Sequence, residues 1–503
     1  MSKKDTQSLK NISRLIKSLR IQKGWTQEEF AHQLKTSQSA VARIEAGKQN
    51  LTTHEILKIG EVLHRKIISI DKSIDFKIIG GKKLHGEIIT NTSKNGAMGL
   101  LAASLLNKGT TVLTRVPHIE EVNRMLEIFE SIGVWYKWDK NSLTIKPPKS
   151  FTLSKINAAT AQKIRSALMM IGPLVHRVNH FKMPHAGGCK MGERTIAAHK
   201  YGLEELGVTI DTTEQFYKIS RHKLRGGDIV MYEAGDTAVI NILLAAAGVE
   251  EQTTISFASS NYQVQEVCFF LQKLGVEIDG VGTHKLTIRG KKEIDTSINF
   301  SVAEDPIESM MFVSAAIVTN SKLIIKRCPI DFLALELLKL KKMGLKYKTS
   351  KSYKSFNERT DLVDVTIFPS KLIAPADKIH ALPYPGINTD NLPFFVPIAT
   401  QAEGQTLIHD WMWENRAIYF TELNRLGANI KLADPHRVFI SGKTPLKATQ
   451  VVCPPALRPA MIVLITMLAA PGESILRNVY AIERGYEDIA NRLNSIGANI
   501  EIL

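Results

Sequence analysis

The sequence predicts an α/β protein of two lobes made of six repeated units, preceded by a small all-α domain. The first observation is a phrase, repeated six times after residue 75, in which a helix ends at a glycine and a strand follows at once. The second is another repeated phrase, an apolar helix that leads through a turn into a β-rich strand. The third is an N-terminal region of short helical patterns. At 503 residues the chain is long enough for about three domains.

The N-terminal region begins with a predicted helix whose pattern stops at Gly24. Residues 1–74 hold 14 lysines and arginines against seven acidic residues, in a chain whose net charge is +16. Because this excess is concentrated in a short segment, an anionic partner is expected there. The apolar residues at helical spacing are Ile12, Leu15, Ile16 and Leu19.

Two further short helices predict a helix-turn-helix. Thr26 and Glu29 match a capping box that begins the first of them. Thr36 and Ser37 provide a turn and an N-cap, and the second helix is expected over residues 38–46. Two short helices joined by a tight turn form this motif.

The second helix carries the candidate DNA contacts. In a helix-turn-helix, the N-terminal side chains of this helix point into the major groove. Gln38, Ser39 and Arg43 are therefore the predicted contacts to double-stranded DNA. Over residues 10–65, the WTQEEFA and VARIEAGK phrases resemble the Cro/repressor-type helix-turn-helix family. A helical bundle used only for dimerisation is the alternative interpretation.

The repeated glycines lie about 70 to 80 residues apart, a period typical of internal duplication. Each lies where a helix C-cap needs a left-handed residue, and the residues after it alternate as in a strand. Six such units are too many for one sheet, so two lobes of three units are expected, with a ligand in the cleft between them. The glycines are Gly133, Gly207, Gly275, Gly344, Gly427 and Gly497.

Several phrases hold more charged residues than the repeats require. Lys94 and Asn95 precede an apolar helix, whose N-terminus favours an anion. Arg165 lies in AQKIRSALMMIGPLV, a predicted helix that is otherwise largely apolar, where a charge needs a partner, a cleft or a route to the surface. Further charged residues in later phrases are Asp390, Glu414, Arg416, Arg458 and Arg484.

The phrase PHAGGCKMGER places Cys189 among glycines, with Lys190 and Arg194 in the same run. These cations can hold a thiolate or attract an anion, and the glycines allow the backbone to move. A surface turn with an incidental cysteine is the simpler interpretation of this stretch alone.

Taken in order, the SKN, GGC...GER, TD, ENR, LRP-like and ERGYE phrases resemble the enolpyruvyl transferases over about residues 75–503. The resemblance is strongest to the members that use UDP-N-acetylglucosamine in the first committed step of peptidoglycan synthesis. It implies that each lobe is an inside-out α/β barrel of three repeated units. The expected domains are a helix-turn-helix domain at 1–66, a linker at 67–74, lobe I at 75–93 and 304–503, and lobe II at 94–303.

The resemblance also implies an activity. The enolpyruvyl group of phosphoenolpyruvate is transferred to the 3-hydroxyl of UDP-N-acetylglucosamine, with release of phosphate and with no cofactor or metal. Cys189 would be the general acid at C3, Asp390 the base, and Lys94 a further catalytic group. The phosphate would be bound by Lys94, Arg194 and Arg484, the carboxylate by Arg416 and Arg458, and the sugar nucleotide by Asn95 and Arg165, with Asp390 also at the substrate.

The acceptor half of this pattern departs from the family. The family's aspartate after the cysteine loop is replaced by Ala197, and Ala456 replaces another acid, whereas Asp305 is present. Glu233 and Asp236 stand where some members contact the diphosphate, and carboxylates there would repel it unless they point away. Two alternatives therefore stay open. One is a transferase for a different acceptor whose helix-turn-helix serves only oligomerisation, and the other is a transcription regulator that uses the transferase part as a ligand sensor.

The composition indicates the cellular compartment in which the protein is expected. The longest apolar run, AMIVLITMLAA at 460–470, is too short to span a bilayer, and the N-terminus has no signal-peptide core. The four cysteines are far apart, so neither a zinc site nor a disulfide framework is indicated. A soluble cytoplasmic protein is expected, without a membrane partner, and a homo-oligomer is compatible with the sequence.

Overall fold

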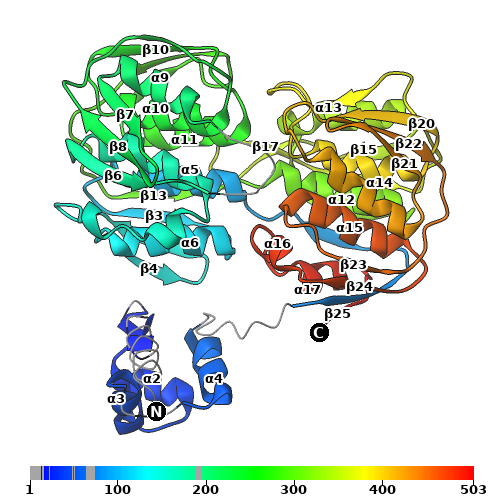
Figure 1. Ribbon diagram of the computed structural model, residues 1–503, viewed down its shortest axis with the longest axis horizontal. Coiled ribbons are helices and arrows are strands. Elements are labelled where there is room, and N and C mark those ends of the chain that lie inside the picture. Colours follow the sequence, from blue (N-terminus) through cyan, green and yellow to red (C-terminus); the bar gives the residue numbers. More distant parts are fainter. Residues whose placement is uncertain are drawn as a thin grey trace. The chain divides into compact units, whose positions relative to one another are not determined.

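The computed structural model describes residues 13, 16–17, 19–21, 23–47, 49, 51–63, 74–187 and 195–503 (Figure 1). The chain divides into two compact units. One unit comprises residues 1–72 and 136–144, and the other comprises residues 73–135 and 145–503. Most of the expected linker, residues 67–73, lies outside the described residues.

The N-terminal helices have the predicted helix-turn-helix elements: α2 (Gln27–Leu34), α3 (Gln38–Glu45) and α4 (Thr53–Leu63). The capping box is confirmed, because Thr26 Oγ1 accepts from the Glu29 amide at 3.1 Å and Glu29 Oε2 accepts from the Thr26 amide at 2.6 Å. Ser37 Oγ caps α3 by accepting from the Ala40 amide at 3.2 Å. The buried core residues are Ile16, Leu19, Phe30, Ala31, Leu34, Val41, Ile44, Ile59 and Leu63.

A buried ion pair holds α3 in place. Arg20 Nε and Nη2 donate to the two carboxylate oxygens of Glu45 at 2.5 and 3.0 Å. Gln27 Nε2 donates to Glu45 Oε2 at 2.9 Å, so the carboxylate also joins α2 to α3. Both members of the ion pair are 8% exposed, so each charge depends on the other for compensation.

The six predicted glycines are confirmed as left-handed, with φ between 86° and 103°. Five of the six follow α-helices, whereas the remaining one, Gly427, follows a 3₁₀-helix, η5 (Ala417–Leu426). The α-helices are α6 (Glu120–Ser131), α9 (Ala197–Glu205), α11 (Tyr262–Lys273), α13 (Ala334–Lys342) and α17 (Ile489–Asn494). The strands that follow the six glycines are β4 (Trp135–Asp139), β7 (Val208–Thr212), β11 (Glu277–Asp279), β15 (Lys346–Thr349), β21 (Ile430–Asp434) and β25 (Ile500–Ile502).

The described residues form six sheets, and each of these six strands lies at the edge of a different sheet. Three sheets use strands between residues 111 and 301, with orders β13-β3-β5-β4, β6-β8-β7 and β11-β12-β10-β9. Their other strands are β3 (Thr111–Thr114), β5 (Ser142–Lys146), β6 (His180–Pro184), β8 (Phe216–Arg221), β9 (Asp228–Val230), β10 (Gln252–Ser256), β12 (Lys285–Arg289) and β13 (Ile298–Ser301).

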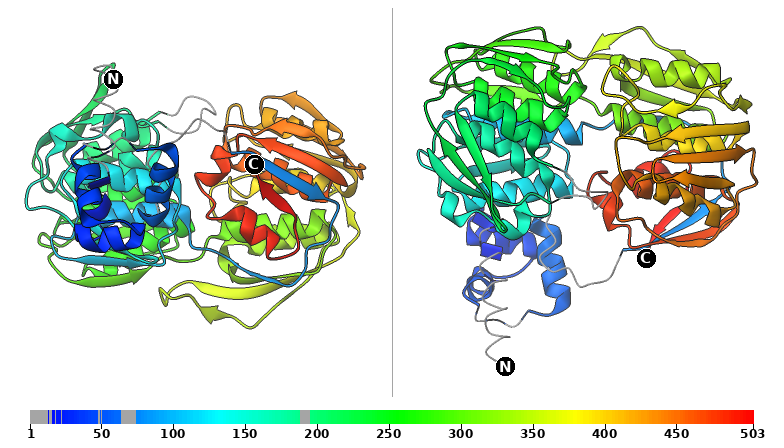
Figure 2. Two further views of the ribbon diagram at one scale, coloured as in Figure 1. Left: turned by 90° about the horizontal axis from the view of Figure 1, so that it is seen from below. Right: turned by 45° about the horizontal axis from the view of Figure 1, so that its top comes forward.

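The other three sheets have the orders β15-β17-β14-β2, β18-β20-β22-β21 and β23-β24-β1-β25, with β16 on β17 and β19 on β20. Apart from most of β4 and β5, these strands belong to the larger unit, in which Figures 1 and 2 show the two sets of sheets as two lobes. The strands are β1 (Phe76–Gly80), β2 (Glu87–Ile89), β14 (Leu323–Pro329), β16 (Tyr353–Lys354), β17 (Asp361–Phe368), β18 (Leu372–Ile373), β19 (Ile379–His380), β20 (Ala402–His409), β22 (Arg437–Gly442), β23 (Gln450–Val452) and β24 (Gly472–Arg477).

Strand β1, at the beginning of the repeat region, completes the sheet of the last repeat. It lies between β24 and β25, and Phe76 pairs antiparallel with Leu476 on one side and Ile502 on the other. Strand β13 adds in parallel to β3, and β2 adds in parallel to β14. Each lobe is therefore completed by strands distant in sequence.

Apolar helices precede five of the sheets, as predicted, and the helices of one lobe contact one another. Helix α12 contacts α14 and α15, and nearly all of its residues are buried, which explains why it is apolar on every side. The closure of each lobe into a barrel stays a prediction. The five helices are α5 (Lys94–Ser104), α10 (Asp236–Ala246), α12 (Pro306–Val318), α14 (Phe395–Thr400) and α15 (Leu457–Ala469).

The prediction of a single helix around Arg165 is wrong. The segment forms α7 (Ala158–Ala161), the 3₁₀-helix η2 (Arg165–Met170) and α8 (Ile171–Leu174), and then leads into β6. Pro173 lacks an amide hydrogen and disfavours a longer helix here. Gly172 packs so closely on α10 that a Cβ would overlap the Asn241 carbonyl oxygen. This broken segment is the sixth helix-to-strand unit.

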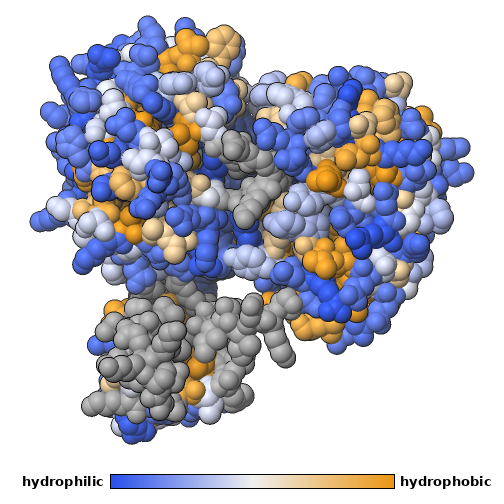
Figure 3. All heavy atoms as spheres, in the orientation of Figure 1, coloured by the Kyte–Doolittle hydropathy of each residue, from blue (hydrophilic) through white to orange (hydrophobic). Residues whose placement is uncertain are grey.

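The remaining helical elements are short. Figure 3 shows a surface on which hydrophilic side chains predominate and apolar ones are scattered in small groups. Among the described residues, no helix has both the length and the apolar character needed to cross a membrane. The short elements are η1 (Leu153–Lys155), η3 (Ile330–Phe332), η4 (Leu392–Phe394) and α16 (Tyr480–Glu483).

Candidate active site

A cavity of about 760 Å³ in the larger unit is lined by residues of both lobes. Every predicted substrate-binding residue that the structure describes lines this cavity. Cys189, Lys190 and Arg194 lie outside the described residues. The predicted residues that the structure brings together are Lys94, Asn95, Arg165, Asp390, Arg416, Arg458 and Arg484, and Glu414 also lines the cavity.

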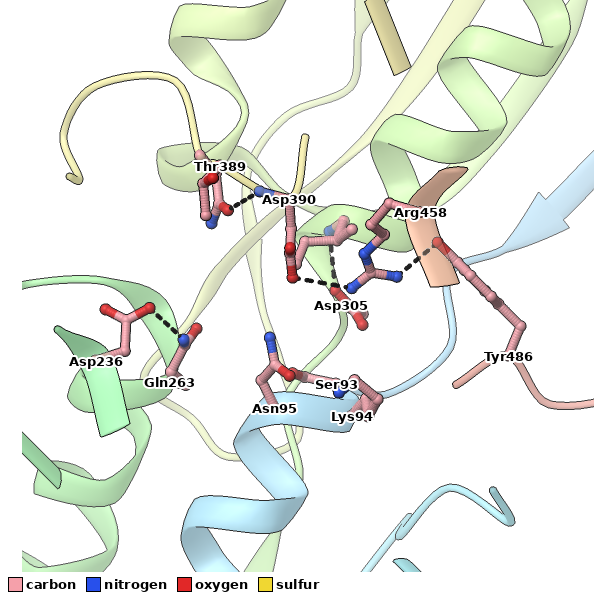
Figure 4. A network of polar contacts seen from close by, with 12 residues as sticks. Ser93, Lys94, Asn95, Asp236, Gln263, Asp305, Thr389, Asp390, Arg458 and Tyr486 are labelled. Atoms are coloured by element: carbon pink, nitrogen blue, oxygen red, sulfur yellow. Dashed lines mark hydrogen bonds and ion pairs between the residues drawn. The ribbon is translucent and has the colours of Figure 1, made fainter. Parts of the chain in front are cut away.

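The start of α5 brings Lys94 and Asn95 to the cavity. Ser93 caps this helix, because its Oγ accepts from the Gly96 amide at 2.9 Å. Asn95 Nδ2 donates to Tyr262 Oη at 3.0 Å. Figure 4 shows Asn95 pointing toward the same space as Asp390 and Arg458. The positive end of the helix dipole adds to the field of Lys94 there.

A carboxylate that the sequence analysis missed joins two of the predicted phosphate-binding cations. Lys94 Nζ lies 2.6 Å from Glu121 Oε2, and Arg484 Nη2 lies 3.0 Å from Glu121 Oε1. Burial raises the pKa of Glu121, but Lys94 and Arg484 lower it more, so this pKa is below its usual range. The sequence shows only two adjacent acids in the first turn of α6, which is common at helix starts.

Asp390 lies beside two arginines. Arg458 Nη2 donates to Asp390 Oδ2 at 3.2 Å, and Arg458 Nη1 donates to Tyr486 Oη at 2.7 Å (Figure 4). Arg416 Nη1 is 3.9 Å from Asp390 Oδ1. Burial raises the pKa of Asp390, but Arg458, Arg416 and Lys94 lower it more, so this pKa is below its usual range. The carboxylate is therefore ionised near neutral pH and can accept a proton.

Arg416 is held by the protein on one side. Its Nε and Nη2 donate to the two oxygens of Asp410 at 2.5 and 2.8 Å, and Nη2 also donates to the Thr389 carbonyl at 2.7 Å. The side chain is only 1% exposed. Asp410, which the sequence analysis did not select, thereby orients Arg416 so that Nη1 faces Asp390.

Asp305 lies behind this group. It caps α12 by accepting from the Ile307 amide at 2.8 Å. Burial raises its pKa to about 6, although Arg458 opposes the shift. Figure 4 shows Asp305 close to Arg458. The electrostatic field of the Arg458 guanidinium therefore acts on both Asp305 and Asp390.

The acceptor end contains Arg165 and a histidine that the sequence analysis missed. Arg165 Nη2 donates to the Thr195 carbonyl at 2.7 Å. His199 lines the cavity and its Nδ1 lies 3.1 Å from Asn241 Nδ2. Burial lowers the pKa of His199 to about 3, and Arg165 contributes to the decrease. His199 is therefore neutral and can accept or donate one hydrogen bond without adding charge.

Asp236 and Glu233, the two acids that stand where some family members contact the diphosphate, differ in their environment. Asp236 accepts hydrogen bonds at 2.5 Å from Ser259 Oγ, at 3.0 Å from Asn261 Nδ2 and at 2.5 Å from Gln263 Nε2. Burial, and to a lesser extent Asp390, raises the pKa of Asp236. Its carboxylate thus joins the starts of α10 and α11, whereas Glu233 is exposed on the cavity wall.

The candidate DNA contacts are all exposed on α3. Gln38 Nε2 donates to Gln27 Oε1 at 2.7 Å, and Ser39 Oγ is 3.0 Å from Ser37 Oγ. These contacts fix the first turn of the helix. Arg43 lies one turn further along the same helix.

Six sheets in two lobes, with a cavity lined by arginines, lysine and aspartate, together with the similarity to known family members, place this chain among the enolpyruvyl transferases. The family described as EPSP synthase (3-phosphoshikimate 1-carboxyvinyltransferase) matches residues 78–493, and a helix-turn-helix family matches residues 16–68. The chain belongs to the EPSP synthase family and carries an N-terminal helix-turn-helix domain.

Two relatives support this placement. The UDP-N-acetylglucosamine 1-carboxyvinyltransferase of Treponema denticola is 37% identical over 430 residues, which cover 85% of this chain and 99% of the relative. The enzyme of the same name from Borrelia garinii is 32% identical over 422 residues, which cover 84% and 97%.

Two solved structures share the fold at lower sequence identity. The enolpyruvyl transferase NikO from Streptomyces tendae has a TM-score of 0.74 at 23% identity, covering 86% of this chain and 99% of that one. The EPSP synthase of Acinetobacter baumannii has a TM-score of 0.67 at 19% identity, covering 86% and 100%.

Proposed function

We propose that the chain transfers the enolpyruvyl group of phosphoenolpyruvate to the 3-hydroxyl of UDP-N-acetylglucosamine, a step of peptidoglycan synthesis. The observation that carries this proposal is the convergence of four cations on one cavity around the ionised Asp390. The names of the relatives support the acceptor. The cations are Lys94, Arg416, Arg458 and Arg484.

Charge complementarity explains the binding roles. Phosphoenolpyruvate is a compact polyanion, and a cavity can hold it only when cationic groups replace its water. Lys94 and Arg484, together with Arg194, would bind the phosphate. Arg458 and Arg416 would bind the carboxylate, because a guanidinium donates in the plane that a carboxylate requires.

The chemistry follows as addition and elimination. Asp390 accepts the proton of the acceptor hydroxyl while the hydroxyl oxygen forms a bond to C2 of phosphoenolpyruvate. Cys189 delivers a proton to C3. Phosphate then leaves C2 while C3 returns a proton to the Cys189 thiolate, which restores both the double bond and the thiol. Lys94, placed at the phosphate, stabilises the negative charge of the leaving group.

A second candidate, transfer to a different acceptor, is favoured by one observation. Ala197 offers no carboxylate where the family has one, and Glu233 adds an exposed carboxylate to the same end of the cavity. Arg165, Asn95 and the neutral His199 would still provide hydrogen bonds to a sugar nucleotide.

Phosphate release discriminates these candidates. The assay mixes phosphoenolpyruvate with UDP-N-acetylglucosamine or with other sugar nucleotides, using wild type and Cys189→Ala. Release with UDP-N-acetylglucosamine that is lost in Cys189→Ala supports the proposal. Release only with another sugar nucleotide supports the second candidate, and binding of phosphoenolpyruvate without release from any acceptor favours a ligand sensor.

We further infer that the helix-turn-helix domain binds double-stranded DNA through α3. The support is the exposure of Gln38, Ser39 and Arg43 on a helix that is fixed by the buried Arg20–Glu45 pair. The excess positive charge of residues 1–74 adds long-range attraction to the DNA backbone.

A further inference from the structure

Glu121 occupies a central position between the two phosphate-binding cations of the proposed function. One carboxylate oxygen faces Lys94 Nζ at 2.6 Å and the other faces Arg484 Nη2 at 3.0 Å. The side chains of Lys94, Glu121 and Arg484 are 15%, 14% and 16% exposed. Both cations are thus neutralised in part by one anion that is largely withdrawn from water.

The backbone holds this carboxylate in place. The Glu121 amide donates to the Arg484 carbonyl at 3.4 Å, so the two residues are joined through the main chain as well as the side chains. Lys94 is the first residue of α5, and Glu121 lies in the first turn of α6. The neighbouring Glu120 differs, because it pairs with Arg124 one turn along the same helix at 2.6 Å.

We propose that Glu121 is an internal counter-anion that competes with phosphate for Lys94 and Arg484. This inference rests on the proposed function, in which these two residues bind the phosphate. A cation that already has a carboxylate at contact distance attracts a phosphate less strongly, because part of its field is cancelled. Glu121 therefore acts as a positioning residue that lets inorganic phosphate leave after each turnover.

Calorimetric titration with inorganic phosphate tests this role without an acceptor or turnover. Glu121→Gln keeps the size of the side chain and removes its charge. The variant is expected to bind phosphate about tenfold more tightly, equivalent to about 1.4 kcal/mol. Glu120→Gln, the same change one residue earlier, is the matched control and is expected to bind phosphate like wild type.

Glu121→Asp provides a second variant that retains the charge. Its shorter side chain reaches the two cations less well, so we expect tighter phosphate binding than in wild type, but by a smaller factor than in Glu121→Gln. Product release also changes, because a more tightly bound phosphate leaves more slowly. Phosphate inhibition of turnover should therefore strengthen in the order wild type, Glu121→Asp, Glu121→Gln.

Unchanged or weaker phosphate binding in both variants would overturn the inference, since Glu121 would then only maintain the shape of the site. If wild type still releases phosphate from phosphoenolpyruvate, the proposed function stands even when the two variants bind phosphate no more tightly. Conversely, tighter phosphate binding in Glu121→Gln by an enzyme that never releases phosphate from phosphoenolpyruvate supports the counter-anion and contradicts the transfer reaction. Absence of phosphate binding in every form contradicts both.

Discussion

Asp390 and Arg458 form a 3.2 Å contact in which a buried guanidinium keeps a cavity carboxylate ionised. Arg458 is anchored on its other side by Tyr486 at 2.7 Å. The pair therefore supplies both a proton acceptor and a cation for the substrate carboxylate within one contact.

Asp390→Asn is expected to lower turnover by about a thousandfold, because an amide cannot accept the hydroxyl proton. Binding of phosphoenolpyruvate is retained, since the change removes a negative charge from the cavity. Phosphate release measures the first effect and calorimetry the second. Asp295→Asn, at an exposed position, is the control. Turnover of Asp390→Asn close to that of wild type would remove Asp390 from the mechanism.

Glu266→Gln is expected to change how stability depends on pH. Burial is the main cause that raises the pKa of Glu266 to about 8, and the nearby Glu304 and Asp305 contribute to the increase. The hydrogen bond from the Ala303 amide opposes part of this increase. The folded state therefore keeps a proton that the unfolded chain releases at lower pH, so wild type loses stability as pH rises from about 4.5 to about 8.

The glutamine variant has no such proton to lose. Its melting temperature should exceed that of wild type by an amount that grows through this pH window and is constant above it. Glu277→Gln, at an exposed position on β11, is the control and should follow wild type. A pH-independent difference between Glu266→Gln and wild type would contradict the role of this titration.

Arg43→Ala is expected to weaken binding to duplex DNA and to reduce its salt dependence, because one phosphate or base contact is lost. Fluorescence anisotropy with mixed-sequence duplexes at several salt concentrations measures both effects. Arg425→Ala removes an exposed arginine from the transferase part and serves as the charge-matched control. Equal loss of affinity in both variants would show that net charge, rather than α3, governs binding.

Glu45→Ala is expected to destabilise the helix-turn-helix domain by about 3–5 kcal/mol, since Arg20 is left buried without its partner. Calorimetric unfolding should then show an early transition, with the transition of the transferase part unchanged. Glu28→Ala alters an exposed acid in α2 and is the comparison. An unchanged first transition in Glu45→Ala would mean that this ion pair adds no stability.

Local patterns predicted the elements that depend on neighbouring residues. The capping box at Thr26, the six left-handed glycines and the apolar helices all follow from interactions within a few positions, so the sequence alone identifies them. The broken segment around Arg165 was missed although Pro173 is visible in the sequence. The close approach of Gly172 to α10, about 70 positions later, is not visible there.

The sequence by itself determined the helix-turn-helix domain, the repeated architecture and the charged residues that gather at the cavity. Only the tertiary structure decided how these charges pair. Glu121 and Arg484 are 363 positions apart, and Asp236 obtains its three donors from the start of another helix. Such pairings depend on how the repeats pack against one another, because burial and distance, rather than residue type, set the strength of each electrostatic contact.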